Sequence, residues 1–240
     1  MNNTMIKMNH NQKFQFRCHS EIKCFNACCQ DLHQVLAPYD ILRLKYHFQI
    51  NSSQFLKTYT QSYIGPETGL PVVVLNTKSQ MDLRCIFVSE KGCLVYPNRP
   101  ASCRYYPLAR MISRSRITGE KKATFMLIQE AHCMGHDEKE NTLLCQQTVD
   151  SWIKSQELTD YDKHNDQMLE LIAAKNTANK NDLSEHDKQL FFMCCYDIDL
   201  FKNYAAERNF FTESQQSTYS LENDIKMLDY SLKWIQQKLF

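Results

Sequence analysis

The chain has 240 residues, 43% of them hydrophobic and 23% charged, so it can bury a core and does not have the composition of a disordered protein. Its formal net charge of +1 combines a basic first part, up to about residue 135, with an acidic remainder. It has only 5 glycines and neither GxGxxG nor GxxxxGKS/T, which argues against a nucleotide-binding site.

The polar start, residues 1–16, contains no apolar segment typical of a signal peptide, and no run of about 18 apolar residues follows. We therefore expect a cytoplasmic protein with no membrane partner. Thiols stay reduced in that compartment. An odd count of 11 cysteines then points to metal or redox chemistry rather than to a disulfide scaffold.

The first elements in chain order are a frayed polar terminus over residues 1–13 and a cysteine-rich loop over residues 18–29, which has no helical or strand periodicity. Pro38 is well suited to the first turn of a helix, where its missing N–H costs nothing. Asn51 and Ser52 are natural N-caps for a second short helix.

Residues 72–75 read as a strand with residues 83–88 as its possible partner. Three prolines predict an irregular, extended segment from Tyr96 to Pro107. Residues 111–116 and 123–129 flank a turn and predict a hairpin. The hairpin is basic but nearly lacks interleaved aromatic residues, so nucleic-acid binding is not expected.

Helical periodicity dominates after residue 136, and its last run steps by 4, 3, 4, 3 and 4 residues from Leu221 to Leu239. The expected fold class is α+β, with an irregular cysteine-rich module that has a few short strands and a mainly helical C-terminal half. We predict a metal-binding module over residues 14–135 and a helical region over residues 136–240 that packs on it.

Eight cysteines in the first 135 residues are the candidate metal ligands: Cys18, Cys24, Cys28, Cys29, Cys85, Cys93, Cys103 and Cys133. Cys24 and Cys28 have the spacing of a zinc knuckle, but no second such pair follows. The adjacent Cys28 and Cys29 fit poorly on one tetrahedral ion. An iron–sulfur cluster tolerates irregular spacing better, so we favour it and keep zinc as the alternative. Eight thiolates could form two four-ligand sites, or one site with spare cysteines.

Other residues near these cysteines carry weaker signals. His19 and His132 could replace a thiolate, although a loop histidine is the more ordinary interpretation. Arg104 is expected to donate hydrogen bonds towards the sulfurs. Asp197 and Asp199 are expected on a solvated helix face. The three remaining cysteines, Cys145, Cys194 and Cys195, are expected to be helix residues without a metal.

Several short motifs follow one another between residues 14 and 135: FRC at residues 16–18, CFNACC at 24–29, GC followed by Tyr96, RP at 99–100 and CRYYP at 103–107. This order resembles the YkgJ-type cysteine-cluster family, which is described as zinc- or iron-chelating and often as predicted iron–sulfur proteins. The resemblance implies the eight cysteines above as ligands and leaves the metal open. In this chain the gaps in the first cluster are wider than the family usually has.

The family resemblance leads to three hypotheses of different classes. The first is an iron–sulfur protein in electron transfer or redox sensing, with a protein or redox partner that the sequence does not name. The second is a zinc-stabilised interaction module without catalysis. The third, weaker one is a protein-modifying enzyme, because a related set with this cysteine pattern includes flagellin lysine methylases; no S-adenosylmethionine pocket is recognisable in the sequence.

Overall fold

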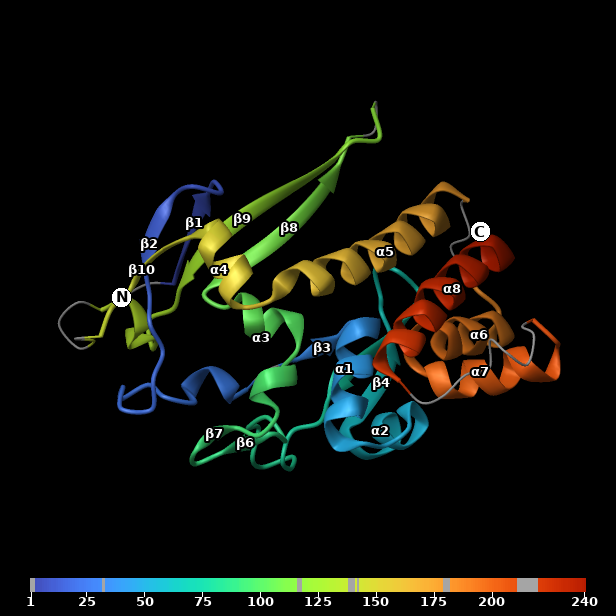
Figure 1. Cartoon of the computed structure of the whole chain (residues 1–240), viewed down its shortest axis with the longest axis horizontal. Helices are drawn as coiled ribbons and strands as arrows, with labels where there is room; N and C mark the ends of the chain where they lie inside the picture. The colour runs from blue at the N-terminus through green and yellow to red at the C-terminus, as the bar shows by residue number, and fades with distance from the viewer. Residues whose placement is uncertain are drawn as a thin grey trace.

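The fold was examined in a computed structural model, which describes residues 3–31, 33–115, 118–137, 141, 143–178, 182–210 and 220–240. The class is α+β, as expected: small sheets of short strands occupy the first part, and helices make up the end of the chain (Figure 1). The expected division at residues 135 and 136 remains a prediction, because one apolar core runs from Met8 to Leu239.

The first sheet has the order β1-β9-β8 and contains the predicted hairpin. Its strands are β1 (Thr4–Met8), β8 (Leu108–Arg114) and β9 (Lys121–Gln129), and all pairings are antiparallel. The hairpin projects from the body of the molecule (Figure 1). The expected frayed terminus is wrong for residues 4–8, because β9 is the central strand of this sheet and β1 pairs with the edge of β9 that β8 leaves open.

A second sheet, of order β3-β5-β4, packs near the two predicted early helices. Its strands are β3 (Val35–Leu36), β4 (Thr60–Ile64) and β5 (Pro71–Leu75). The helices α1 (Pro38–Phe48) and α2 (Ser52–Tyr59) begin where predicted, and the Asn51 side chain accepts a hydrogen bond from the Gln54 amide. The proposed partner of β5, residues 83–88, is wrong, because β3 and β4 occupy both edges of β5.

The proline-rich segment is less extended than expected. It contains the 3-10 helix η2 (Tyr96–Asn98), which is one turn long, and the short α-helix α3 (Ala101–Tyr105). Pro100 precedes the first residue of α3, and Asp40 of α1 accepts a hydrogen bond from the Ala101 amide at 2.8 Å. A tertiary contact therefore initiates this helix, which is why local proline content did not reveal it.

Two short strand pairs frame the cysteine-rich part. β6 (Val88–Ser89) pairs with β7 (Gly92–Cys93), and β2 (Lys13–Gln15) pairs with β10 (Gln146–Thr148). The second pair ties the segment just before Cys18 to the start of the helical half. Two further 3-10 helices of one turn each are η1 (Ala27–Cys29) and η3 (Met134–His136).

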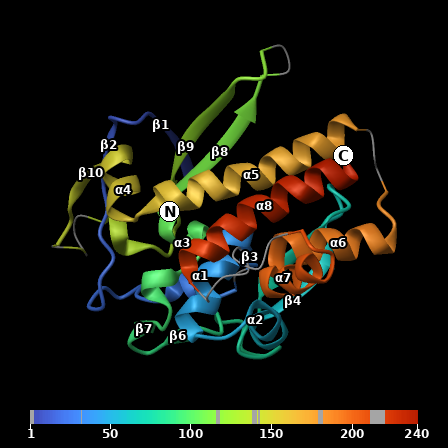
Figure 2. The same ribbon diagram turned by 45° about the vertical axis from the view of Figure 1, so that its right-hand side comes forward.

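Five helices end the described part of the chain: α4 (Val149–Ser155), α5 (Leu158–Thr177), α6 (Glu185–Tyr196), α7 (Ile198–Glu207) and α8 (Leu221–Leu239). Figure 2 shows α5 and α8 side by side, and both also pack against α1. The predicted apolar stripe of α8 is confirmed, since Leu228, Leu232 and Ile235 are buried. No helix in the described ranges is long and apolar enough to cross a membrane.

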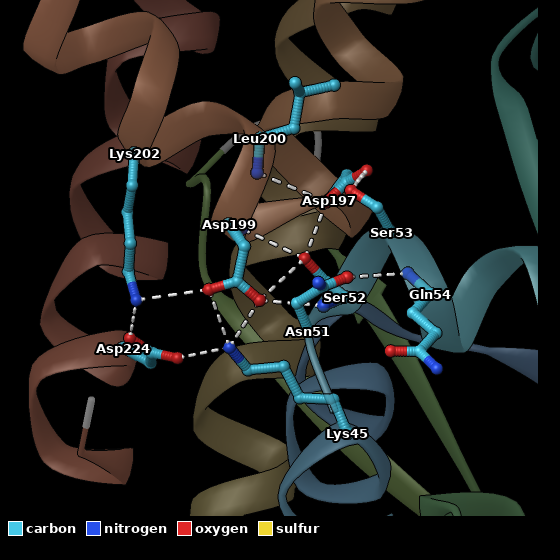
Figure 3. Close-up of polar contacts among 10 residues, drawn as sticks. All are labelled: Lys45, Asn51, Ser52, Ser53, Gln54, Asp197, Asp199, Leu200, Lys202 and Asp224. Carbon is cyan, nitrogen blue, oxygen red and sulfur yellow. Dashed lines mark hydrogen bonds and ion pairs between the residues drawn. The ribbon is translucent and has the colours of Figure 1, made fainter. Parts of the chain in front are cut away.

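A buried ionic cluster joins the early helices to the late ones (Figure 3). The fully buried Lys45 ammonium of α1 lies 2.8 Å from an Asp199 oxygen of α7 and 2.5 Å from an Asp224 oxygen of α8. Lys202 also contacts both carboxylates. We name Lys45, Asp199, Lys202 and Asp224 the lysine–aspartate cluster.

The expectation of a solvated face at Asp197 and Asp199 is wrong. Asp197 is buried and accepts hydrogen bonds from the hydroxyls of Ser52 and Ser53, each at 2.6 Å (Figure 3). Asp199 accepts one from the Ser52 amide at 2.7 Å. These partners lie about 145 residues earlier in the chain, so no local pattern could reveal them.

Candidate metal centre

The eight candidate cysteines come from segments far apart in sequence. Cys18 and Cys24 lie in the loop that follows β2, and η1 contains Cys28 and Cys29. The remaining four are Cys85 before β6, Cys93 at the end of β7, Cys103 in α3 and Cys133 just before η3. All eight are free thiols that are intermediate or exposed in accessibility. Most of the thiols therefore lie in loops, single-turn helices or short strands rather than within long helices or strands.

Backbone contacts hold the η1 turn against the segment that carries Cys85. The Cys85 amide donates to the Cys29 carbonyl at 2.8 Å, and Gln30 bridges to Arg84. Asn26 precedes η1 with a left-handed φ of 67°, a conformation that asparagine tolerates, and its side-chain amide donates to the Ser89 carbonyl. The Cys28–Cys29 pair is therefore fixed beside β6.

The opposite end of the cysteine loop is held against the Cys133 turn. The Met134 amide donates to the Cys24 sulfur at 3.1 Å, and the Arg17 amide donates to the Gly135 carbonyl. A Cβ atom at residue 135 would come within 2.3 Å of the Phe16 ring, so glycine is required for this close packing. Residues 132–136 thus pack against the segment just before Cys18.

One set of thiols gathers around Cys18. Although Cys18 is exposed, partial desolvation raises the pKa of its thiol to about 11, and three neighbouring thiols add to the effect: those of Cys28, Cys24 and Cys133. Burial also raises the pKa of Cys133, and Cys24 and Cys28 again contribute. Four sulfurs from two parts of the chain therefore lie within electrostatic range of one another.

A second set gathers around Cys103. Burial raises the pKa of this thiol to about 12, and Cys85 and Cys93 are the next contributors. The Cys28–Cys29 pair connects the two sets: interaction between the adjacent thiols lowers the pKa of Cys28 and raises that of Cys29. Cys85 and Cys103 also raise the pKa of Cys29. Cys29 therefore belongs with the second set, whereas Cys28 interacts with both.

Backbone N–H groups point at several of these sulfurs. Burial raises the pKa of the Cys85 thiol, and the amides of Phe87 and Val88 oppose that rise by donating to the sulfur. Cys93 receives the same help from the Val95 amide, and Cys133 from the Gly135 amide. In all three cases a donor lies two residues after the cysteine. Such donors stabilise an anionic sulfur, which is the form that binds a metal.

Arg99, rather than the expected Arg104, acts on the cysteines. Its charge lowers the pKa of the Cys18, Cys28 and Cys93 thiols against the larger effects of burial and neighbouring groups. The Arg104 guanidinium is instead occupied by backbone carbonyls, those of Pro97, Arg99 and Gln156. Arg104 therefore stabilises the backbone around α3. The prediction that it donates to the sulfurs, which rested on its position next to Cys103, is wrong.

The histidines in this region differ in what they can offer. The Nε2 atom of His19 lies 3.1 Å from the Asn141 side-chain oxygen, while its buried Nδ1 atom has no hydrogen-bond partner among the described residues. His132 is half exposed, and its nearest charged partner is Glu130 at 3.7 Å. Both ring nitrogens of His136 face backbone carbonyls. His19 is thus the histidine with a nitrogen available beside the thiols.

Two polar residues near the sulfurs were not identified from the sequence. The Cys103 thiol lies 3.4 Å from the Gln34 side-chain oxygen, and the Gln34 amide donates to the Ser102 hydroxyl at 2.6 Å. The Tyr106 hydroxyl interacts with Cys133 and lowers the pKa of that thiol against the effect of burial. The CRYYP motif could have drawn attention to Tyr106, because it contains this residue. No sequence motif marked Gln34.

The donor chemistry of the eight thiols fits a thiophilic metal. Among the described residues, no three His, Cys, Asp or Glu side chains converge closely enough to form a complete metal site. The fit rests on eight reduced thiols, on amide donors to the sulfurs and on the unpaired His19 nitrogen. Cys194 and Cys195 are buried in the helix α6, as expected, whereas Cys145 is exposed and lies just before β10, so its expected place in a helix is wrong.

The comparison with known families agrees with this donor set. Residues 17–165, more than half of the chain, match the profile of the CxxCxxCC family, described as a "Putative zinc- or iron-chelating domain". The chain belongs to this family. Neither the curated proteins nor the solved structures that were searched contain a match to the chain. Membership supports binding of zinc or iron and places the eight cysteines within the matched region.

Proposed function

We propose that the chain is an iron–sulfur protein that serves electron transfer or redox sensing, with the eight cysteines between Cys18 and Cys133 as ligands. The observation that carries the proposal is the gathering of eight reduced thiols from five parts of the chain. Family membership supports a zinc- or iron-binding role. Thiolates bind both metals, so the choice of iron rests on the ligand arrangement.

The arrangement favours two four-thiolate sites. Cys18, Cys24, Cys28 and Cys133 form the first set, and Cys29, Cys85, Cys93 and Cys103 form the second. In this proposal the adjacent Cys28 and Cys29 serve different sites, which avoids placing neighbouring sulfurs on one small ion. Contributions from several distant segments suit clusters, whose iron atoms separate the thiolates in space.

Bound clusters would supply one-electron redox chemistry, and the protein would set their potential. Amide donors at Cys85, Cys93 and Cys133 stabilise the thiolates, and the Arg99 charge offsets part of the negative charge of the site. Exposure of Cys18 and Cys28 puts the first set near solvent, where a redox partner could approach. Zinc in the same positions would stabilise the fold without redox chemistry.

Metal and sulfide analysis of protein purified without oxygen tests the proposal. Iron, acid-labile sulfide and a broad visible absorption that bleaches on reduction are expected. Colourless protein with stoichiometric zinc and no redox change would instead establish the zinc-stabilised interaction module.

Serine substitutions test the ligand assignment. Cys29→Ser and Cys103→Ser should each lose the metal of the second site and keep that of the first. Cys18→Ser and Cys133→Ser should each lose the metal of the first site and keep that of the second. The matched control for the exposed Cys18 is the exposed Cys145, and Cys145→Ser should retain full metal content. Metal loss in Cys145→Ser, or equal loss from both groups in every ligand variant, would contradict the two-site assignment.

A further inference from the structure

A groove of about 600 Å³ lies between the β8 strand, the second sheet and α5. Leu108 and Ile112 of β8 line one wall, and Met168, Leu169 and Ile172 of α5 line another. The exposed fraction of Leu169 is 42%, which is high for a leucine on the wall of a groove. Its volume falls within the range of about 300–1,000 Å³ typical of ligand sites, and apolar side chains predominate. The metal proposal does not use this feature.

The β8 strand presents a free edge beside the groove. Its sheet has the order β1-β9-β8, so β8 pairs with β9 on one side and with no described strand on the other. Seven residues, Leu108–Arg114, form this edge, which corresponds to about 24 Å of strand. A free edge offers amide and carbonyl groups at strand spacing, and an extended chain can pair with them.

The side chains along β8 match the geometry of such pairing. Leu108, Arg110 and Ile112 alternate along the strand and share one face, and all three line the groove. A chain added at the edge would place every second side chain on that same face, next to the apolar wall of α5. The groove therefore suits a strand whose inward side chains are mostly apolar.

The polar groups of the groove select for hydrogen-bond donors and positive charge. Asp40 and Asp162 line it against one cation, Arg110, which is itself shared between Asp162 and Asp166. The buried side-chain oxygen of Asn165, also in the lining, has no hydrogen-bond partner among the described residues. Asp40 already accepts hydrogen bonds from the Ala37 and Ala101 amides, and Asp162 accepts one from the Tyr105 hydroxyl. The lining therefore has two carboxylates against one cation, and the Asn165 oxygen is an acceptor still open to a donor.

From these contacts we infer that the groove binds an extended peptide segment of a partner protein, which pairs with the free edge of β8. The segment is about seven residues long, with apolar side chains at alternate inward positions and one basic side chain among them. Ser102 and Tyr106 line the same groove and contact Gln34 and Cys133, so the bound segment lies beside the second and first thiol sets.

Peptide binding to the full-length, metal-containing protein tests this inference. The probes are fluorescein-labelled seven-residue peptides of alternating valine and serine, with arginine replacing each valine in turn. Fluorescence anisotropy should find at least one peptide with a Kd below about 1 mM. Replacing its arginine by glutamine should weaken binding roughly fivefold. Failure of the whole panel to bind would overturn the inference.

Backbone methylation distinguishes strand pairing from simple filling of the groove. Only alternate amides of a paired strand face the neighbouring strand. Methylating the odd-numbered amides of the best peptide and, separately, the even-numbered amides should therefore give unequal effects. One set should weaken binding roughly tenfold and the other little. Equal effects from the two sets would show that the peptide does not pair with β8.

Two protein variants locate the site. Leu169→Asp places a charge on the groove wall and should weaken binding roughly tenfold. Leu200→Asp on α7 is the matched control, because Leu200 is 47% exposed and does not line the groove. Equal affinities of the two variants would overturn the assignment to this groove. Dimerisation of the free protein that is lost in Leu169→Asp would identify a second copy as the occupant, which also overturns it.

Discussion

The thiol sets and the lysine–aspartate cluster both bring ionisable groups from distant segments together, but they are completed differently. In the lysine–aspartate cluster, Lys45 and Lys202 provide the charges that Asp199 and Asp224 require. In the thiol sets, neighbouring sulfurs raise the pKa of Cys18 and Cys103, and Arg99 is a cation within range of several of the thiols. The first is balanced by charges within the chain, whereas a metal, if bound as we propose, would supply positive charge to the second.

Metal removal should give the largest contrast between the two regions. Structural metal sites contribute on the order of 10 kcal/mol of folding energy in small zinc domains, and the segments around the thiols contain little regular structure. Chelation without oxygen should therefore increase amide hydrogen exchange in residues 16–31 and 84–105. Exchange in α1, α2 and α8 should change little, because the lysine–aspartate cluster remains.

Hydrogen exchange followed by mass spectrometry provides the measurement. Protein treated with the chelator already saturated with zinc serves as the control. Uniform loss of protection across the whole chain would show that the two regions are not energetically separate.

Breaking the lysine–aspartate cluster should have the next largest effect. Lys45→Met leaves the fully buried Asp224 without its nearest buried cation and should cost about 3–5 kcal/mol in the free energy of unfolding. Lys202→Met is the matched control; its side chain is 27% exposed, so the cost should be about 1 kcal/mol. Urea denaturation measures both. A smaller cost for Lys45→Met than for Lys202→Met would contradict the central role of Lys45.

Arg99 should have a moderate effect that is confined to the thiol sets. Arg99→Met removes a charge that favours three thiolates, so metal affinity should fall about tenfold. Arg99→Lys should restore part of it by keeping the charge. Competition with a chromophoric chelator gives the affinities. Arg84→Met is the control, because the exposed Arg84 pairs with Asp82. An equal loss of metal affinity in Arg84→Met would contradict a specific effect of Arg99.

Acidification should have the smallest effect and act on the lysine–aspartate cluster. Burial alone would raise the pKa of Asp199, but hydrogen bonds from Lys45 and Ser52 outweigh it and hold the pKa below its usual 3.8. Because the folded-state pKa is the lower one, this stabilisation is present above pH 3.8 and is lost as pH falls through the folded value. The stability difference between wild type and Asp199→Asn should therefore shrink below pH 3.8. A difference that stays constant or grows would be inconsistent with this coupling.

Local patterns predicted the elements whose stability is local. Pro38, Asn51 and the apolar stripe of α8 marked helices at the correct positions, because caps and amphipathic faces are properties of short segments. Strand pairing was less predictable. β1 pairs with β9 about 120 residues away, and the edges of β5 are taken by β3 and β4 rather than by residues 83–88.

The same limit separates the two arginines of the candidate centre. Proximity in sequence favoured Arg104, which follows Cys103 directly, yet its guanidinium is used by carbonyls of Pro97, Arg99 and Gln156. In a short helix, neighbouring side chains point in different directions. Arg99, at the start of that segment, acts on the sulfurs instead.

The sequence by itself determined the class of chemistry, because clustered cysteines and the family motif are read directly from residue identities. Only the tertiary structure decided which distant cysteines lie near Cys29, and how Asp197 and Asp199 pack against α2. Both outcomes depend on contacts between residues more than 50 positions apart. Such contacts follow from the packing of the whole chain, and no local residue pattern encodes them.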